Sequence, residues 1–512
     1  MSEQKSSMPL FWGCFIALVA TAFGFIVRAM IIGEWGAEFN LDSTQQGELF
    51  GAGLYPFAIS IILFSLVIDR IGYKVAMVFG FVCHMVGTLI IILAQGYWSL
   101  YVGTFILALG NGTVEAYINP VVATIFSKGK TKWLSILHAG WPGGLVLAGI
   151  IALLVGDALG WRVKFGLVFI PTIIYFIMLI GKRFPVSERV AAGVSYRDML
   201  KEVGALGIFI MFGLILAELG RVFGIWGGGA SLMLAAVIAV GFGIVARGLG
   251  RPLFLLFLLL MIPLATTELG VDSWVTDLMT PVMGKYAGWL LVYTSAIMLV
   301  LRFMAGPIVH ALSPLGLLAA SAALAAVGLF ILSGAQAGIV IFIAATIYGV
   351  GKTFFWPATL GVVAEQFPRG GALTLNGVAA VGMLGVGVIG TQFMGNLQDR
   401  ASTKILQEQH GEVYEQVIGE ERLSVFGRYR SVDGSKVAEM GDETRELVGE
   451  VRDSSKQRAL RTIVILPVGM LVVYLGLLLY FRSKGGYRAE VIAGHDAEDK
   501  KFTGGVEGPA DH

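Results

Sequence analysis

Apolar residues occur along this chain in long, nearly uninterrupted runs, and polar residues fall mainly in the short segments between them. A helix needs about 20 apolar residues to cross a bilayer, and each run is near that length. The pattern predicts an all-α polytopic membrane protein with about fourteen transmembrane helices. The predicted spans cover residues 9–31, 47–67, 75–95, 99–126, 134–157, 163–182, 204–222, 227–246, 252–275, 288–310, 314–334, 337–362, 373–396 and 461–481.

The composition supports a membrane protein and excludes other classes. Hydrophobic residues make up 56% of the 512 residues and charged residues only 14%, and no water-soluble domain needs so much apolar surface. The 69 glycines suit helices that pack closely through small residues. We therefore expect the lipid bilayer as surroundings and no nucleic-acid partner, and nothing in the chain indicates an oligomeric state.

Motifs for metals, nucleotides and disulfides are weak. The six histidines form no close pair of metal ligands, and the Gly-Lys-Thr of GVGKTFFW lacks the earlier glycine of a phosphate-binding loop. Cys14 and Cys83 both fall in apolar spans, so no disulfide framework is expected. His138, about one turn from a predicted cytoplasmic helix end, fits a structural histidine better than a proton relay. We expect no metal and no cofactor.

Lysine and arginine set the expected orientation. They are abundant in connections that all fall on one side of the predicted membrane, which the positive-inside rule makes cytoplasmic: residues 69–74, 127–132, 182–201 and 247–251. An even number of spans then places both termini in the cytoplasm. The first apolar run is too long for a signal peptide and is expected to be retained. The cell membrane, inner or plasma, is the expected location.

The stretch GNGTVEAYINP carries a carboxylate near the middle of a predicted span. A spacing of four residues puts Asn111, Glu115 and Asn119 on one helical face. An ionisable group at that depth costs several kcal/mol unless it meets a partner or water, so it indicates a functional site. Glu115 is therefore the leading candidate for chemistry.

The segment SLVIDRIGYK, residues 65–74, resembles the cytoplasmic loop motif of the major facilitator superfamily of secondary transporters. Asp69 and Arg70 stand in the motif positions, whereas Ser65 replaces its leading glycine and Tyr73 one basic residue. An Asp at a helix end beside basic residues can pair with a neighbouring helix in one conformation and release it in another, which suggests a gating role. The alternative is that these charges only set topology.

The resemblance implies two six-helix bundles that rock about a midplane solute site. Residues 1–182 would form one bundle and residues 251–482 the other, joined by a cytoplasmic linker, 183–203, and two inserted helices in 204–250. A polar extracytoplasmic loop, 399–461, would interrupt the second bundle as short surface helices or a partly disordered cap. Residues 483–512 are expected to form a disordered cytoplasmic tail.

An internal repeat agrees with two related bundles. GTVEAYINP and GVGKTFFWP share Gly, an ionisable residue three positions later and Pro eight positions later, so Glu115 and Lys352 are expected to face each other. The segment RFMAGPIVHALSP, residues 302–314, lies where the loop motif should recur, with His310 in the place of Asp69.

GNGTVEAYINP also resembles the proton-coupled fucose and glucose/galactose permeases, and this resemblance implies that Glu115 exchanges a proton and helps to hold sugar hydroxyls. A permanently protonated structural Glu115 is the alternative. Arg28, the ionisable residue of the first span, resembles the arginine of an anion-transporting branch, although Val27 replaces that branch's aspartate. Arg28 could bind substrate, form an outer gate with Glu268 and Asp272, or extend to lipid headgroups.

Aromatic and cationic side chains near these residues could complete a solute site. Tyr348, Lys352 and Trp356 recur every four residues, so a hydroxyl, a cation and a large ring share one face. Lys352 could bind the solute or simply pair with Glu115, and Trp356 could stack on a sugar or only pack. Trp141, in HAGWPGG, falls in a span that glycine and proline are expected to bend.

These observations predict a secondary active transporter that couples a small polar solute, a sugar or sugar derivative, to inward proton flow. The first alternative is an organic-anion transporter that uses Arg28, with a sugar acid or carboxylate as substrate. The second is a non-transporting sensor with the 399–461 loop as its output surface. An intramembrane enzyme would need a nucleophile and a base at one depth, and no such set is evident.

Overall fold

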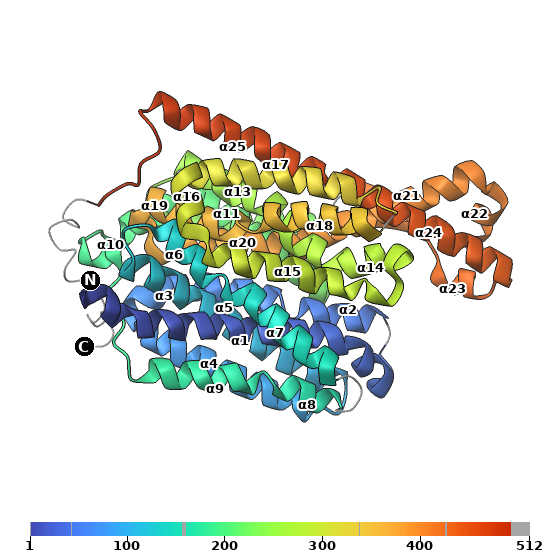
Figure 1. The fold of residues 1–512 in the computed structure, drawn as a ribbon, viewed down its shortest axis with the longest axis horizontal. Coiled ribbons are helices and arrows are strands. Elements are labelled where there is room, and N and C mark those ends of the chain that lie inside the picture. The colour runs from blue at the N-terminus through green and yellow to red at the C-terminus, as the bar shows by residue number, and fades with distance from the viewer. Residues whose placement is uncertain (1, 42, 156–159, 337, 425–426, 493–512) are drawn as a thin grey trace.

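Long helices packed side by side along one axis make up almost all of the molecule (Figure 1). The computed structural model describes residues 2–41, 43–155, 160–336, 338–424 and 427–492. The N-terminus, helix α10 (Glu188–Ala191) and residues 484–492 lie at one end of the molecule, which we call the terminal face. We call the opposite end, where helices α22 (Gly411–Val417) and α23 (Gly434–Ala438) protrude, the module face.

The N-terminal half occupies the lower part of Figure 1. Its second, fifth and sixth predicted spans each consist of two consecutive helices. In the second span, Pro56 lies in the first turn of one helix, and Gly72, with φ of 82°, ends the same helix and reverses the chain. The helices are α1 (Ser2–Phe39), α2 (Ser43–Gly51), α3 (Tyr55–Ile71), α4 (Tyr73–Ile92), α5 (Tyr97–Ile125), α6 (Lys130–Leu137), α7 (Gly140–Val155), α8 (Trp161–Gly166) and α9 (Phe169–Ile180).

The C-terminal half contains more interruptions. Two of its spans contain π-helical turns, and one pair of helices meets at an angle of 73°. The elements are α13 (Pro252–Ala265), η2 (Thr266–Gly270), α14 (Val271–Met283), η3 (Gly284–Tyr286), α15 (Gly288–Phe303), α16 (Ala305–Leu312), α17 (Pro314–Leu332), α18 (Gly338–Lys352), α19 (Phe355–Gln366), η4 (Pro368–Gly370), α20 (Gly371–Leu384), η5 (Gly385–Gly390), α21 (Thr391–Gln409), α24 (Asp442–Ile463) and α25 (Ile465–Ser483).

Two helices are inserted between the halves, α11 (Tyr196–Phe223) and α12 (Gly228–Ala246). Helix α11 starts inside the predicted linker 183–203, because the Ser195 side chain accepts a hydrogen bond from the Asp198 amide and caps it. It packs against α3 of the N-terminal half and α13 and α20 of the C-terminal half. Helix α12 packs on α11 and keeps most of its side chains exposed. The first inserted helix therefore contacts both halves.

The predicted polar loop 399–461 is largely ordered. Helices α21 and α24 extend beyond the bundle and carry α22 (Gly411–Val417), α23 (Gly434–Ala438) and an antiparallel hairpin of β1 (Ile418–Ser424) and β2 (Gly427–Val432). Its small core is apolar and consists of Ile405, Leu406, Val417, Val448 and Val451. The short helices were expected, whereas the hairpin was not. Predicted tail residues 493–512 lie outside the described residues.

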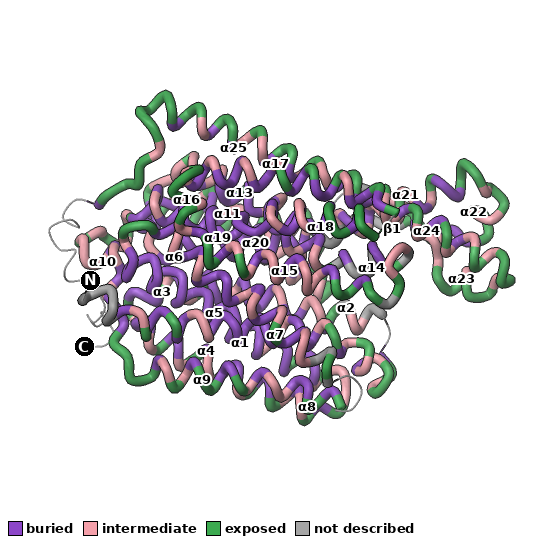
Figure 2. Tube along the Cα trace, viewed as in Figure 1, coloured by how far each residue is buried: buried purple, intermediate pink, exposed green. Residues whose placement is uncertain are grey.

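The described residues contain 12 helices that are long and apolar enough to cross a membrane, or 13 if the bent pair α15–α16 is one span. The all-α polytopic fold is thus confirmed, but the predicted count of about fourteen is not reached by this criterion. The predicted span missing from the set is α5, whose 29 residues are long enough but include Asn111, Glu115 and Asn119. Every residue of α5 from Gly110 to Ile125 is buried, so the most polar span lies in the core (Figure 2).

Candidate functional site

A small cavity lies between the two halves, with a volume of about 30 Å³. Both halves contribute carboxylates and indole rings to its wall. The lining residues are Phe57, Glu115, His138, Trp141, Glu268, Leu269, Arg302, Trp356 and Met383. Since its volume is near that of one water molecule, this conformation is closed around the site.

Glu115 enters the wall of this cavity from α5. Its carboxylate accepts a hydrogen bond of 2.5 Å from Asn119 Nδ2, one helical turn later. The Asn119 carbonyl oxygen is 3.0 Å from Nε2 of His138, at the end of α6. Within the described residues Glu115 forms no ion pair, although it is only 5% exposed. The expected pairing of Glu115 and Asn119 on one face is therefore present.

Asn111 lies one turn earlier on α5 but takes no part in the cavity wall. Its Oδ1 atom is 2.9 Å from Nε2 of His84 on α4, and His84 Nδ1 is 3.3 Å from the Tyr175 hydroxyl of α9. These three side chains are buried within the N-terminal half. The structure thus gives Asn111 a structural partner, and its predicted role in solute binding has no support in the geometry.

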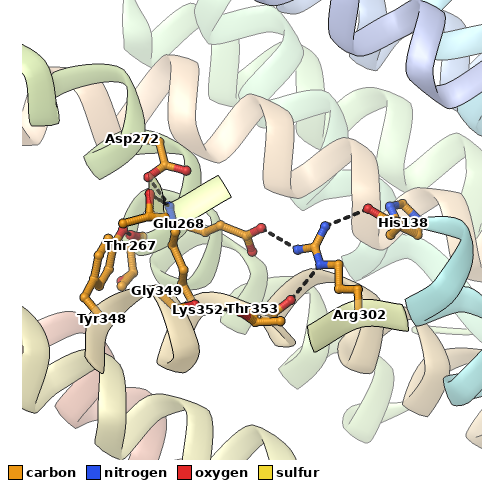
Figure 3. A network of polar contacts seen from close by, with 10 residues as sticks. His138, Thr267, Glu268, Asp272, Arg302, Tyr348, Gly349, Lys352 and Thr353 are labelled. Carbon is orange, nitrogen blue, oxygen red and sulfur yellow. Dashed lines mark hydrogen bonds and ion pairs between the residues drawn. The ribbon is translucent and has the colours of Figure 1, made fainter. Parts of the chain in front are cut away.

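In the C-terminal half the buried Glu268 and the partly buried Asp272 are each compensated by a cation (Figure 3). Arg302 Nη2 donates to Glu268 Oε1 at 2.9 Å, and the two side chains are 1% and 2% exposed. Lys352 Nζ donates to Asp272 and, at 3.3 Å, to Thr294 Oγ1. The expected apposition of Lys352 and Glu115 is therefore wrong, because Lys352 is bound to the carboxylate of its own half.

Arg28 is buried beside aromatic rings and forms no ion pair with described residues. Its guanidinium carbon is 5.9 Å from the ring centroid of Phe25 and 5.4 Å from that of Phe50, and its Nε atom has no hydrogen-bond partner. A Cβ built on Gly53 would lie 1.9 Å from its Nη1 atom, so the guanidinium lies directly on that glycine. Among the described residues Arg28 forms no ion pair with Glu268 or Asp272, which are bound to Arg302 and Lys352 in this conformation, so the expected outer gate stays a prediction.

The predicted aromatic residues divide into two groups. Trp141 on α7 and Trp356 on α19 line the cavity from opposite halves, and Trp356 packs on Gly382, where a Cβ would lie 2.8 Å from its ring. Tyr348 instead donates a hydrogen bond of 2.7 Å to the Thr267 carbonyl and fastens α18 to η2. The two tryptophans are thus placed to contact a solute, and Tyr348 is not.

A second, larger cavity of about 380 Å³ lies nearer the module face. It is lined mainly by apolar and aromatic side chains, with Asp272 as its charged residue. Trp141 and Leu269 line both cavities and therefore separate them. The lining residues are Phe25, Ile26, Ala29, Met30, Phe50, Trp141, Leu145, Gly149, Leu269, Asp272, Ser273, Gly288, Trp289, Leu291 and Val292.

Polar contacts between the halves close the molecule towards the terminal face. Lys130, at the start of α6, donates to the Ala364 carbonyl of α19 at 3.3 Å. The next residue, Thr131, donates to Glu365 Oε1 at 2.8 Å. Helix α3 also packs on α20 across the same interface. The described conformation is therefore closed at the terminal face and has its larger cavity towards the module face.

The loop-motif residues lie at this closed end. Arg189 of α10 donates to Asp69 from Nε at 3.0 Å, and both side chains are buried. The Arg70 guanidinium carbon is 4.7 Å above the Tyr196 ring of α11. Asp69 thus forms an ion pair with the segment that joins the halves, so its charge does more than set the topology. The gating role itself stays a prediction.

Sequence reasoning missed Arg302 and undervalued His138. Arg302 was placed with a loop motif near a helix end, but α15 bends into α16 just after it, and its side chain is fully buried. His138 was expected about one turn from the cytoplasmic end, yet it lies in the cavity wall. A usable signal was present for His138, since a proline four residues later marks a helix break.

Comparisons with known proteins agree with this architecture. The family model of the Major Facilitator Superfamily matches residues 13–391. A gentisate transporter of Corynebacterium glutamicum is 22% identical over 161 residues, which is 31% of this chain and 36% of that protein. The chain thus matches only about a third of that relative's length.

Solved structures show the same fold at low sequence identity. The proton:xylose symporter XylE of E. coli, bound to 6-bromo-6-deoxy-D-glucose, gives a TM-score of 0.58 at 16% identity, over 80% of this chain and 92% of that one. The human organic anion transporter MFSD10 gives 0.61 at 9% identity, over 93% and 100% of the two chains. Since the family model covers well over half of the sequence, this multi-pass membrane protein belongs to the Major Facilitator Superfamily of transporters.

Proposed function

We propose that this protein is a secondary active transporter that couples a small polar solute, a sugar or sugar derivative, to proton flow. The observation that carries the proposal is Glu115, a carboxylate in the wall of a cavity between the halves that no cation compensates within the described residues. A proton can bind there without releasing a cation from an ion pair. Glu268 and Asp272 lack this property because each is bound to a basic side chain.

The cavity wall also supports a solute with hydroxyl groups and an apolar face. Glu115, with Asn119 and His138 behind it, offers hydrogen-bond acceptors and donors on one side. Trp141 and Trp356 offer flat apolar surfaces from the two halves, on which a sugar ring can stack. We expect the solute to enter from the larger cavity, displace the separating pair Trp141 and Leu269, and leave after the terminal face opens.

Proton-driven uptake into vesicles tests this function. A pH gradient should drive solute accumulation by the natural protein, and Glu115→Gln should reduce it by about 100-fold, since proton transfer groups contribute on this scale. Exchange of labelled for unlabelled solute, which needs no net proton transfer, should survive. Glu443→Gln, on an exposed part of α24, is the matched control. If Glu115→Gln still responds fully to the pH gradient, the coupling assignment is wrong.

An organic anion is the second candidate substrate, and Arg28 is the observation that favours it. A buried guanidinium without a carboxylate partner is suited to a carboxylate from outside, which it can bind through two parallel hydrogen bonds. The partial sequence match to a gentisate transporter points the same way. The proton at Glu115 would then remove the uncompensated negative charge in the cavity wall, since the other carboxylate there, Glu268, is paired with Arg302.

A panel of neutral sugars, sugar acids and aromatic acids distinguishes the two substrate classes. A ligand that binds only the folded protein raises its melting temperature by an amount that grows with concentration. Stabilisation by neutral sugars that persists in Arg28→Gln supports the sugar proposal. Stabilisation by acids that Arg28→Gln abolishes supports the anion instead.

A further inference from the structure

Arg302 occupies the junction of four interrupted helices. It lies in the last turn of α15, immediately before the 73° bend into α16, and is 1% exposed. All three of its guanidinium nitrogens donate hydrogen bonds: Nε to the Thr353 carbonyl at 2.7 Å, Nη1 to the His138 carbonyl at 2.8 Å and Nη2 to Glu268 at 2.9 Å. Figure 3 shows these three contacts diverging from one side chain.

Each acceptor lies at a break in another helix. Thr353 falls between α18 and α19, His138 between α6 and α7, and Glu268 in the π-helical turn between α13 and α14. A break exposes backbone groups that water cannot satisfy inside a membrane. Arg302 therefore donates a hydrogen bond at three helix breaks, to a backbone carbonyl at two of them and to a carboxylate at the third.

Proline explains why the two backbone carbonyls, of Thr353 and His138, need a hydrogen-bond donor from outside their own helix. In a continuous helix the carbonyl of residue i accepts from the amide of residue i+4. The residues four positions after Thr353 and His138 are Pro357 and Pro142, which have no amide hydrogen. Apart from a 3.3 Å bond from the Trp141 amide to His138, Arg302 supplies the donors that the prolines remove.

The bond to His138 crosses between the halves, whereas the bonds to Thr353 and Glu268 stay within the C-terminal half. We propose that Arg302 is a positioning residue that pins the two halves together at the helix breaks in this conformation, and that Glu268 holds it in the pinning orientation. Losing the charge of Glu268, or drawing Arg302 towards a solute, frees the His138 carbonyl and lets the halves part at the terminal face. The biological role of this pin rests on the proposed transport function, but the experiments below measure stability and distances and do not depend on transport.

A double-mutant cycle tests whether Arg302 replaces the missing proline amides. Lysine keeps the charge of Arg302 but has one nitrogen for three divergent acceptors, so we expect it to stay with Glu268 and to leave both the Thr353 and the His138 carbonyl without a donor. Pro357→Ala restores an amide four residues after Thr353. We expect Pro357→Ala to raise the melting temperature of Arg302→Lys clearly more than that of the natural protein. Equal shifts in the two backgrounds would overturn the pairing.

Distances between spin labels at Lys128 and Arg369 test the pinning itself. Both residues are exposed, one in each half near the terminal face, and Cys14 and Cys83 are buried, so only introduced cysteines are labelled. We expect Arg302→Lys to raise the ratio of separated to closed molecules about fivefold or more, as for the loss of one net hydrogen bond. Arg162→Lys, which alters an exposed ion pair, should leave the ratio unchanged.

Glu268→Gln gives an independent variant should Arg302→Lys fail to fold. Glutamine can still accept from Arg302 but without charge, so the ratio should shift in the same direction by a smaller factor. Unchanged distances in both variants would overturn the pin even if transport is observed. Conversely, the expected shifts in a protein that moves no solute would contradict the proposed function and leave the pin standing.

Discussion

The two halves treat the charges deep in their helices in opposite ways, although Asp69, near the terminal face of the N-terminal half, is paired with Arg189. In the C-terminal half both deep carboxylates are neutralised, Glu268 by Arg302 and Asp272 by Lys352. In the N-terminal half Glu115 and Arg28 are as deeply buried, yet neither has an ion-pair partner among the described residues. Paired charges hold helices to one another, whereas an unpaired charge is available to a proton or a solute. From this contrast we infer that the deep charges of the C-terminal half hold its helices together, whereas those of the N-terminal half bind a proton or a solute.

The contrast arises from segments with the same sequence pattern. GTVEAYINP and GVGKTFFWP place an ionisable residue and a proline at equal spacing. Lys352 has a carboxylate within reach on α14, whereas Glu115 has the Asn119 amide and no ion-pair partner in the part of the chain that the structure describes. A shared pattern thus predicts equivalent positions in the two halves without predicting equivalent partners.

Removing Arg302 should have the largest effect on stability. Arg302→Met leaves Glu268 as an uncompensated buried charge, which typically costs about 3–5 kcal/mol. Chemical unfolding in detergent or lipid measures this loss, with Arg162→Met at an exposed ion pair expected within about 0.5 kcal/mol of the natural protein. A loss of less than about 1 kcal/mol for Arg302→Met would break the distinction between the halves.

Asp69 tests a paired charge near the terminal face of the N-terminal half. Asp69→Asn keeps the shape but removes the charge that binds Arg189, and should cost about 1.5–3 kcal/mol, as for a hydrogen bond between charged groups. The label distance between Lys128 and Arg369 should lengthen in the same variant. An unchanged stability would show that pairing matters only at the centre of the bundle.

Neutralising the unpaired charges should change stability little or raise it. Glu115→Gln and Arg28→Met each remove a buried charge that no partner compensates, so the change in unfolding free energy should lie within about 1 kcal/mol of zero or be stabilising. The same unfolding assay measures it. A loss as large as that of Arg302→Met would mean that either residue has a structural partner after all.

Asp433 gives the smallest expected effect, since it is a partly exposed charge at the start of α23. The Ser435 amide donates to its carboxylate and holds the pKa of Asp433 below the ordinary value of 3.8. Its stabilising contribution is therefore present above that value and lost as the pH falls through the lower folded pKa. Exchange protection of the α23 amides should fall there, and Asp433→Asn, which keeps a cap, should lose this pH dependence.

The sequence predicted features that depend on a single helix, such as its length and which residues share a face. It did not predict contacts between side chains of several helices. The run lengths predicted the polytopic fold, and the spacing of four predicted the contact of Glu115 with Asn119. Asn111 has the same spacing, yet it faces His84 because α4 packs on that turn of α5. The pairing of Glu268 with Arg302 depends on a π-helical turn and on a 73° bend between two helices. Neither feature can be predicted from the pattern of hydrophobic residues.

The central claim, that Glu115 carries the coupled proton, is tested most directly by counting protons. Solute identified by the stabilisation panel is added to the purified protein in weakly buffered solution, and the change in pH is measured. The natural protein should take up or release up to about one proton per solute bound, and Glu115→Gln should exchange none. An undiminished proton exchange in Glu115→Gln would contradict the account.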